Sequence, residues 1–125
     1  MSKPETILIV DDDQSTRQLL SDFFILSGFI TAQAGSGEEA IQLVRNENPS
    51  VILLDMLMPG MDGLETLKKI REIRPNAGII MATGLEDEER AQEAIALGAY
   101  GYVVKPFDLK YLELMVHTHL VTASD

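Results

Sequence analysis

The chain has 125 residues, a length typical of one domain, and 46% of them are hydrophobic, enough for one sizeable core. Twenty acidic residues against ten basic ones give a formal charge of −10, so nucleic acid or an anionic membrane would repel the surface. The absence of cysteine excludes disulfides, thiol catalysis and cysteine-based zinc sites. No signal peptide or membrane-spanning stretch is recognisable. We therefore expect a single soluble, cytoplasmic domain over residues 1–125, without direct contact to nucleic acid or membrane.

Five short runs of aliphatic or β-branched residues predict strands, and each is followed by a stretch of helical periodicity. The strand candidates are Ile7–Val10, Ile30–Ala34, Val51–Leu54, Ile79–Ala82 and Gly101–Val104. The first and third runs are apolar without polar alternation, as in strands that are covered on both faces. This pattern favours a buried parallel sheet.

The stretches between the strands carry apolar residues at helical spacing. In chain order the apolar stripes are Leu19, Leu20, Phe23 and Phe24; Ala40, Ile41 and Val44; Leu64, Leu67 and Ile70; Ala91, Ala94 and Ile95; and Leu109, Leu112 and Val116. Ser36, followed three residues later by Glu39, predicts a capping box at the start of the second helix. Asp108 is expected to cap the fifth helix.

Five strand–helix units in series predict an α/β fold. Short connections and right-handed crossovers favour an open, doubly wound, five-stranded parallel sheet with helices on both faces. In such sheets, binding sites form at the carboxyl ends of the strands, near the point where the strand order reverses. The side chains that follow each predicted strand are therefore the candidates for function.

Polar residues follow four of the five predicted strands. Asp11 and Asp12 come after the first strand, Asp55 after the third, Thr83 after the fourth and Lys105 after the fifth. If the strand order is 2-1-3-4-5, the first and third strands are neighbours. The three aspartates then converge within several ångströms.

Clustered carboxylates raise one another's pKa unless a cation keeps them ionised. An all-oxygen site of this kind suits Mg²⁺, with Mn²⁺ as an alternative. A threonine hydroxyl and a lysine ammonium on the same edge could hold the oxygens of a phosphoryl group. Asp55, at the centre of this edge, is then the candidate nucleophile for an acyl phosphate.

Four segments at these strand ends carry a family resemblance: Ile7–Asp13, Leu53–Gly63, Ala82–Gly84 and Gly101–Phe107. Taken together, these segments resemble the receiver domain of two-component response regulators. The resemblance extends from about Thr6 to Val121. The resemblance implies a flavodoxin-like (βα)5 fold with strand order 2-1-3-4-5. It also implies a phosphoprotein of phosphorelay signal transduction that has no turnover on an external substrate.

The resemblance assigns roles around the acidic cluster. Asp55 would accept a phosphoryl group from the phosphohistidine of a sensor histidine kinase or phosphotransfer protein. Asp12 would bind Mg²⁺ directly, Asp11 would act mostly through water, and the main-chain carbonyl of Leu57 would be a further ligand. Asp55 itself would complete the metal site.

Further roles concern the switch that follows phosphorylation. Thr83 and Lys105 would contact the phosphoryl oxygens, and the Lys105–Pro106 peptide bond would be cis. Tyr102 would turn inward when Thr83 moves toward the phosphate. The surface made by the fourth helix, fifth strand and fifth helix would then change its affinity for a downstream effector, and phosphorylation could also produce a homodimer.

Two alternatives remain open at this point. Asp11-x-Asp13-x-Ser15 after a hydrophobic strand loosely matches the haloacid-dehalogenase-like phosphatase signature, which would make Asp11 the nucleophile. That interpretation leaves the loop after Asp55 unexplained. A receiver-like interaction module that never carries phosphate is the other alternative.

Three polar residues have a structural interpretation instead. Asp13 favours the positive end of the helix that follows it. His117 and His119 stand two residues apart on a helix and do not face each other, so they are interpreted as ordinary helix-end residues.

Overall fold

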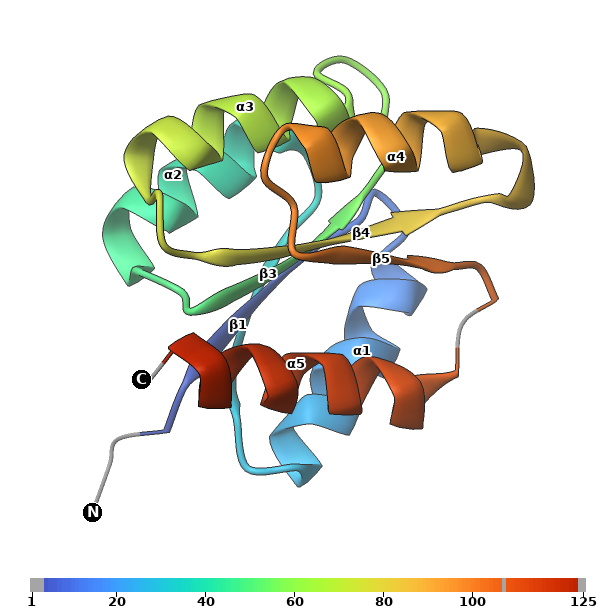
Figure 1. The fold of residues 1–125 in the computed structure, drawn as a ribbon. Coiled ribbons are helices and arrows are strands. Elements are labelled where there is room, and N and C mark those ends of the chain that lie inside the picture. Colours follow the sequence, from blue (N-terminus) through green and yellow to red (C-terminus); the bar gives the residue numbers. More distant parts are fainter. Residues whose placement is uncertain (1–3, 107, 124–125) are drawn as a thin grey trace.

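A five-stranded parallel sheet in the order β2-β1-β3-β4-β5 forms the centre of the computed structural model (Figure 1). The structure describes residues 4–106 and 108–123, so Phe107 and both ends of the expected 1–125 domain lie outside it. The strands are β1 Thr6–Val10, β2 Ile30–Ala34, β3 Val51–Asp55, β4 Gly78–Thr83 and β5 Gly101–Val104. All four strand pairs are parallel, which confirms the predicted order.

At their carboxyl ends, β3 and β4 each extend one residue further than the sequence predicts, and at their amino ends β1 and β4 each begin one residue earlier. Asp55 pairs with Ala82 and Thr83 pairs with Val104 in the parallel ladders, so Asp55 ends β3 and Thr83 ends β4. The polar side chains do not end the strands because the main-chain hydrogen bonds of the ladder continue past them. Both side chains are thereby fixed by the sheet and not by a loop.

Helices cover both faces of the sheet. They are α1 Gln14–Leu26, α2 Gly37–Glu47, α3 Gly63–Ile73, α4 Glu88–Ala96 and α5 Leu109–Ala123, and a short 3-10 turn, η1 Leu85–Asp87, precedes α4. Figure 1 shows α1 and α5 on one face and α2, α3 and α4 on the other. None of the described helices combines the length and the apolar character that a membrane span requires.

The core consists of two apolar layers, one on each face of the sheet. Successive side chains of β1 alternate between them: Leu8 belongs to the layer under α2, α3 and α4, whereas Ile7 and Ile9 belong to the layer under α1 and α5. In β3, Ile52 and Leu53 divide in the same way. This two-sided burial explains the continuous apolar runs in the central strands.

Side-chain caps define the helix starts. Ser36 Oγ accepts a hydrogen bond from the Glu39 N–H at 3.1 Å, as the capping-box pattern predicts. The Glu39 carboxylate, however, accepts from the Gly35 N–H at 2.6 Å, one residue further back than the usual box. At α5, Asp108 Oδ1 accepts from the Lys110 N–H at 2.9 Å.

Gly63, the first residue of α3, packs directly behind the main chain at the end of β3. A Cβ added here would lie 2.6 Å from the Asp55 carbonyl oxygen and 2.7 Å from Met56 Cα. We expect Gly63→Ala to lower the free energy of unfolding by about 1–3 kcal/mol, because backbone atoms have little room to shift. Urea denaturation measures this. Gly84→Ala is the control, since its Cβ would meet only the tip of the Glu86 side chain at 3.2 Å; equal losses in both variants would contradict the prediction.

Candidate functional site

Three aspartates meet at the carboxyl edge of the sheet. Each of Asp11, Asp12 and Asp55 offers a carboxylate oxygen, and these three oxygens lie within 4.8 Å of one another. Asp11 and Asp55 are 4% and 6% exposed, whereas Asp12 is exposed. The adjacency of β1 and β3 produces this arrangement, because their equivalent ends carry the aspartates.

Lys105 is the cation of this cluster. Its Nζ donates hydrogen bonds to Asp55 Oδ1 at 3.1 Å and to Asp11 Oδ2 at 3.3 Å. The residue directly follows β5, its N–H donates to the Thr83 carbonyl at 2.7 Å, and the Lys105–Pro106 peptide bond is cis. One ammonium group thus pairs with the two buried carboxylates.

The charges in the cluster shift the pKa of its members. Burial raises the pKa of the Asp55 carboxyl, Lys105 opposes this effect, and the charge of Asp11 adds to it, with a net rise above the ordinary value. For Lys105, burial lowers the pKa, but the charges and hydrogen bonds of Asp55 and Asp11 outweigh burial and raise it. Lys105 therefore does not fully offset the cost of burying the ionised Asp55 carboxyl. The cluster offers three carboxylate oxygens that one ion could contact, and a single ammonium group faces these three carboxylates. Such a site fits a divalent cation that prefers oxygen ligands.

Thr83 and Tyr102 lie on the same face of the sheet. Met81 is opposite Tyr102 in the β4–β5 ladder, and Thr83 is two residues beyond Met81. The buried Thr83 hydroxyl donates to the Gly84 carbonyl at 3.2 Å, and Asp55 is not its partner. The half-buried Tyr102 accepts a hydrogen bond from Gln92 of α4 at 3.4 Å through its hydroxyl. The two side chains are thus placed to influence each other across one face.

The main chain after β3 folds around the Asp55 carboxylate. The Leu57 N–H donates to Asp55 Oδ1 at 3.4 Å, and the Leu57 side chain is 50% exposed.

Asp13 behaves differently from the other aspartates of its run. Its carboxylate accepts hydrogen bonds from the Ser15 N–H and the Thr16 hydroxyl, so it caps α1, as the sequence interpretation proposes.

Sequence reasoning missed the contacts of two arginines, one at Asp11 and the other at the end of the loop that follows β3. Arg17 of α1 donates to the Asp11 carbonyl at 2.7 Å, and the sequence contains no local signal for this contact. Arg90 of α4 pairs with Asp62 at 2.8 Å. Asp62 caps α3 by accepting a hydrogen bond from the Glu65 N–H. This hydrogen bond lowers the pKa of the Asp62 carboxyl. Burial opposes the effect, whereas the hydrogen bond and the charge of Arg90 add to it, so the net shift is downward. The cap could have been found, because Asp62 stands two residues before Leu64, the first residue of the apolar stripe of α3.

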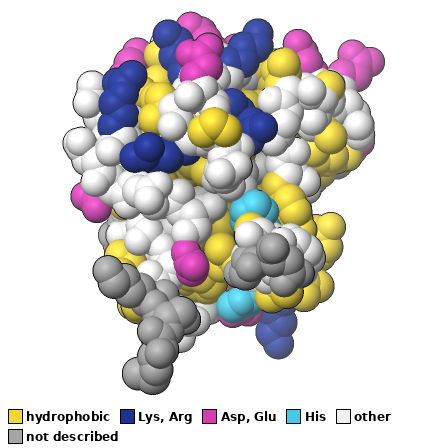
Figure 2. Space-filling model, turned by 60° about the vertical axis from the view of Figure 1, so that its left-hand side comes forward, with side chains coloured by type: hydrophobic (Ala, Val, Ile, Leu, Met, Phe, Trp, Pro, Cys, Tyr) yellow, Lys and Arg dark blue, Asp and Glu magenta, His cyan; other side chains and the backbone are white. Residues whose placement is uncertain are grey.

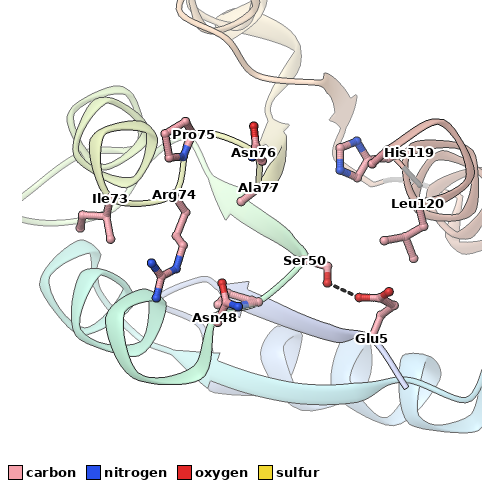
Figure 3. Close-up of a pocket in the computed structure, with 12 residues that line it drawn as sticks. Glu5, Asn48, Ser50, Ile73, Arg74, Pro75, Asn76, Ala77, His119 and Leu120 are labelled. Atoms are coloured by element: carbon pink, nitrogen blue, oxygen red, sulfur yellow. Dashed lines mark hydrogen bonds between the residues drawn. The ribbon is translucent and has the colours of Figure 1, made fainter. Parts of the chain in front are cut away.

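Two hollows differ in their relation to the cluster. One of about 480 Å³ includes Lys105 and is lined otherwise by Thr16, Leu19, Leu20, Pro106 and Leu109. The other, of about 400 Å³, lies at the amino ends of the strands and contains none of the predicted site residues (Figure 3). Its lining mixes the cationic Arg74 with the anionic Glu5, so its chemistry favours no single class of ligand.

The two histidines form no joint site. Figure 2 shows histidine side chains as two separate patches on the face in view. His119 contacts the ring of Tyr100, and burial lowers the pKa of the His119 imidazole. His117 lies 3.8 Å from the Glu113 carboxylate within α5. Their separate surroundings agree with their interpretation as helix residues.

A doubly wound α/β domain with a carboxylate cluster and a lysine at one sheet edge has the architecture of a phosphoacceptor signalling domain. The family model of the response regulator receiver domain matches residues 7–117, and the chain belongs to this family. The predicted resemblance and fold are therefore confirmed. Receiver domains act as phosphoacceptors in signalling and not as metabolic enzymes.

Individual relatives agree with this assignment. Regulatory protein AtoC of Escherichia coli is 42% identical over 96% of this chain, which spans 26% of AtoC. Sporulation initiation phosphotransferase F of Bacillus subtilis is 40% identical over 97% of this chain and 98% of its own length. The solved receiver domain of NtrX from Brucella abortus superposes with a TM-score of 0.88 at 31% identity, covering 93% of this chain and 98% of that one.

Asp55→Asn removes a buried charge, and we expect it to stabilise the fold at neutral pH without divalent cations. Because the pKa of Asp55 is raised in the folded state, its ionised carboxyl costs stability above that raised pKa. The cost disappears as the pH falls below the unfolded value of about 3.9. Lys105 keeps Asp11 as a partner in the variant.

Urea denaturation in a chelator, between about pH 4 and pH 8, measures the stability difference between wild type and Asp55→Asn. The gain should be small at the acid end and reach a plateau at neutral pH. A variant less stable than wild type at pH 7, or a difference independent of pH, would contradict the prediction.

Proposed function

We propose that Asp55 is the phosphoacceptor, and that the chain takes a phosphoryl group from a phosphohistidine on a sensor histidine kinase or phosphotransfer protein. The observation that carries this proposal is the position of Asp55: buried at the end of β3, 3.1 Å from Lys105 and beside Asp11 and Asp12. A carboxylate oxygen attacks phosphorus in line, the phosphorus–nitrogen bond breaks, and the imidazole leaves with the bond's electron pair.

The residues that would hold Mg²⁺, or Mn²⁺ in its place, are Asp11, Asp12 and Asp55 with the main-chain carbonyl of Leu57. The three carboxylate oxygens within 4.8 Å of one another support this assignment. When bound, the ion neutralises the carboxylates and offsets the charge on the phosphoryl oxygens. The chain's own residues then orient and retain the transferred group.

Lys105 and Thr83 would hold the phosphoryl oxygens. The Lys105 ammonium already contacts Asp55, so a small displacement brings it to a phosphoryl oxygen. The Thr83 hydroxyl must first leave the Gly84 carbonyl. Its movement opens space for Tyr102 on the same face of the sheet and changes the surface of α4, β5 and α5. A downstream effector, or a second phosphorylated copy, would recognise that surface.

The hollow beside Lys105 supports docking of the phosphohistidine donor at this edge. Leu19, which is 60% exposed, and Leu109 line it next to the ammonium group. A donor helix could bury these apolar side chains while its histidine faces Asp55. The chain then takes part in its own phosphorylation and dephosphorylation without turnover of an external substrate. We place this exchange in the cytoplasm, where sensor kinases carry their phosphohistidine.

We expect acetyl phosphate to modify position 55 alone. Borohydride reduction followed by peptide mapping identifies the phosphorylated aspartate, because it converts the acyl phosphate into a stable alcohol. Asp55→Asn should incorporate no phosphate while retaining the far-ultraviolet circular dichroism of the wild type. Modification at Asp11 would instead support the phosphatase alternative, and no modification of the wild type would support the phosphate-independent module.

We expect Mg²⁺ to raise the thermal stability of the wild type at constant ionic strength. A cation that binds only the folded state stabilises it by about 2.7 kcal/mol at a hundred times its Kd. Asp12→Asn should remove most of this effect, whereas Glu72→Gln, at an exposed carboxylate of α3, should retain it. Differential scanning fluorimetry with MgCl2 against NaCl decides the matter, and an equal response of both variants would show non-specific screening.

A further inference from the structure

Among the side chains that the structure describes, few attach α4 to the rest of the fold. The buried residues of α4 are Ala91 and Ala94, which are small, and the N-cap residue Asp87 makes no side-chain capping bond. Among the described residues, two side-chain hydrogen bonds join α4 to other segments: Gln92 to Tyr102, and Arg90 to Asp62. A change in either contact therefore has a large relative effect on the position of α4.

Asp62 connects three parts of the molecule. Its Oδ1 accepts from the Glu65 N–H at 3.0 Å and caps α3, while its Oδ2 accepts from Arg90 Nη2 at 2.8 Å. Its carbonyl accepts from the Thr66 hydroxyl at 2.8 Å. Asp62 also ends the loop of residues 56–62 that follows Asp55. Outside the Asp11–Asp55–Lys105 group, the Arg90–Asp62 contact is the only ion pair between separate segments of the described chain.

The ion pair occurs together with the resting positions of the switch side chains. In the same structure the Thr83 hydroxyl is bonded to Gly84, and Tyr102 is bonded to Gln92 of α4. In this arrangement the Thr83 hydroxyl is directed to the Gly84 carbonyl and not to the Asp55 carboxylate. The ion pair therefore holds α4 against the loop after Asp55 in this arrangement.

We propose that the Arg90–Asp62 ion pair stabilises the unphosphorylated position of α4 and opposes the switch. The proposal rests on the proposed phosphoacceptor function. The ion pair joins α4, whose position changes in the proposed switch, to the loop of residues 56–62, which follows Asp55. Its loss therefore alters the equilibrium between the two positions of α4. Side-chain exposures of 33% for Arg90 and 41% for Asp62 limit its contribution. Loss of the pair should shift the equilibrium by at most about fivefold.

Arg90→Gln and Asp62→Asn test the proposal. Asparagine still caps a helix, so Asp62→Asn removes the ion pair but retains the cap of α3. Each variant should bind beryllofluoride with Mg²⁺ up to about fivefold more tightly than wild type, because less free energy is needed to leave the resting state. Each should also increase hydrogen exchange of the α4 amides. The double variant should match the single variants, since both remove the same interaction.

Lys68→Gln is the matched control, because it removes one positive charge from an exposed position on α3. An equal effect of Lys68→Gln, additive effects in the double variant, or unchanged affinity and exchange would each overturn the proposal. Failure of the wild type to bind beryllofluoride would overturn the phosphoacceptor function instead. Hydrogen exchange in α4 would still report separately on the ion pair.

Discussion

The burial of carboxylate charge at the neighbouring ends of β1 and β3, together with the repulsion between those charges, is the constraint on which the site depends. Two charges 4.8 Å apart interact by about 3.5 kcal/mol at an effective dielectric constant of about 20. Lys105 contacts both buried members of the cluster, yet burial and, to a smaller extent, the charge of Asp11 keep the pKa of Asp55 raised. Three carboxylates against one ammonium leave a local excess of two negative charges when all are ionised. That excess is the charge of one divalent cation.

The topology of the sheet makes this concentration of charge tolerable. The reversal of strand order places β1 beside β3, so Asp11 and Asp55 occupy equivalent ends of neighbouring strands. Two apolar layers, one on each face, hold these strands rigidly in place. Gly63 then lets α3 pack against the main chain of Asp55, where a larger residue has no room. The free energy of core packing thereby offsets the electrostatic cost of the site.

Patterns within short segments of the sequence were sufficient to predict the sheet and the carboxylate cluster. Apolar runs gave the strands, and the polar residues after them gave Asp11, Asp12, Asp55, Thr83 and Lys105 as neighbours on one edge. The boundary of β3 was less predictable, since continued pairing with β4 keeps Asp55 inside the strand. Arg90 and Asp62 are 28 residues apart, and no local pattern indicates such a contact. The resting hydrogen bond of Thr83 was equally inaccessible, because it depends on a side-chain rotamer.

The energetics of the proposed switch agree with how weakly α4 is held. Changing a two-state population from 1:99 to 99:1 requires about 5.5 kcal/mol of differential binding. Hydrogen bonds to charged groups contribute about 1.5–3 kcal/mol each, so the proposed contacts of Thr83 and Lys105 with a phosphoryl group would supply about 3–6 kcal/mol together, a range that includes this requirement. A helix anchored by many large buried side chains would exceed that supply. Because the buried residues of α4 in the described part of the chain are the small Ala91 and Ala94, two polar contacts at Asp55 would be enough to move the helix in the proposed switch.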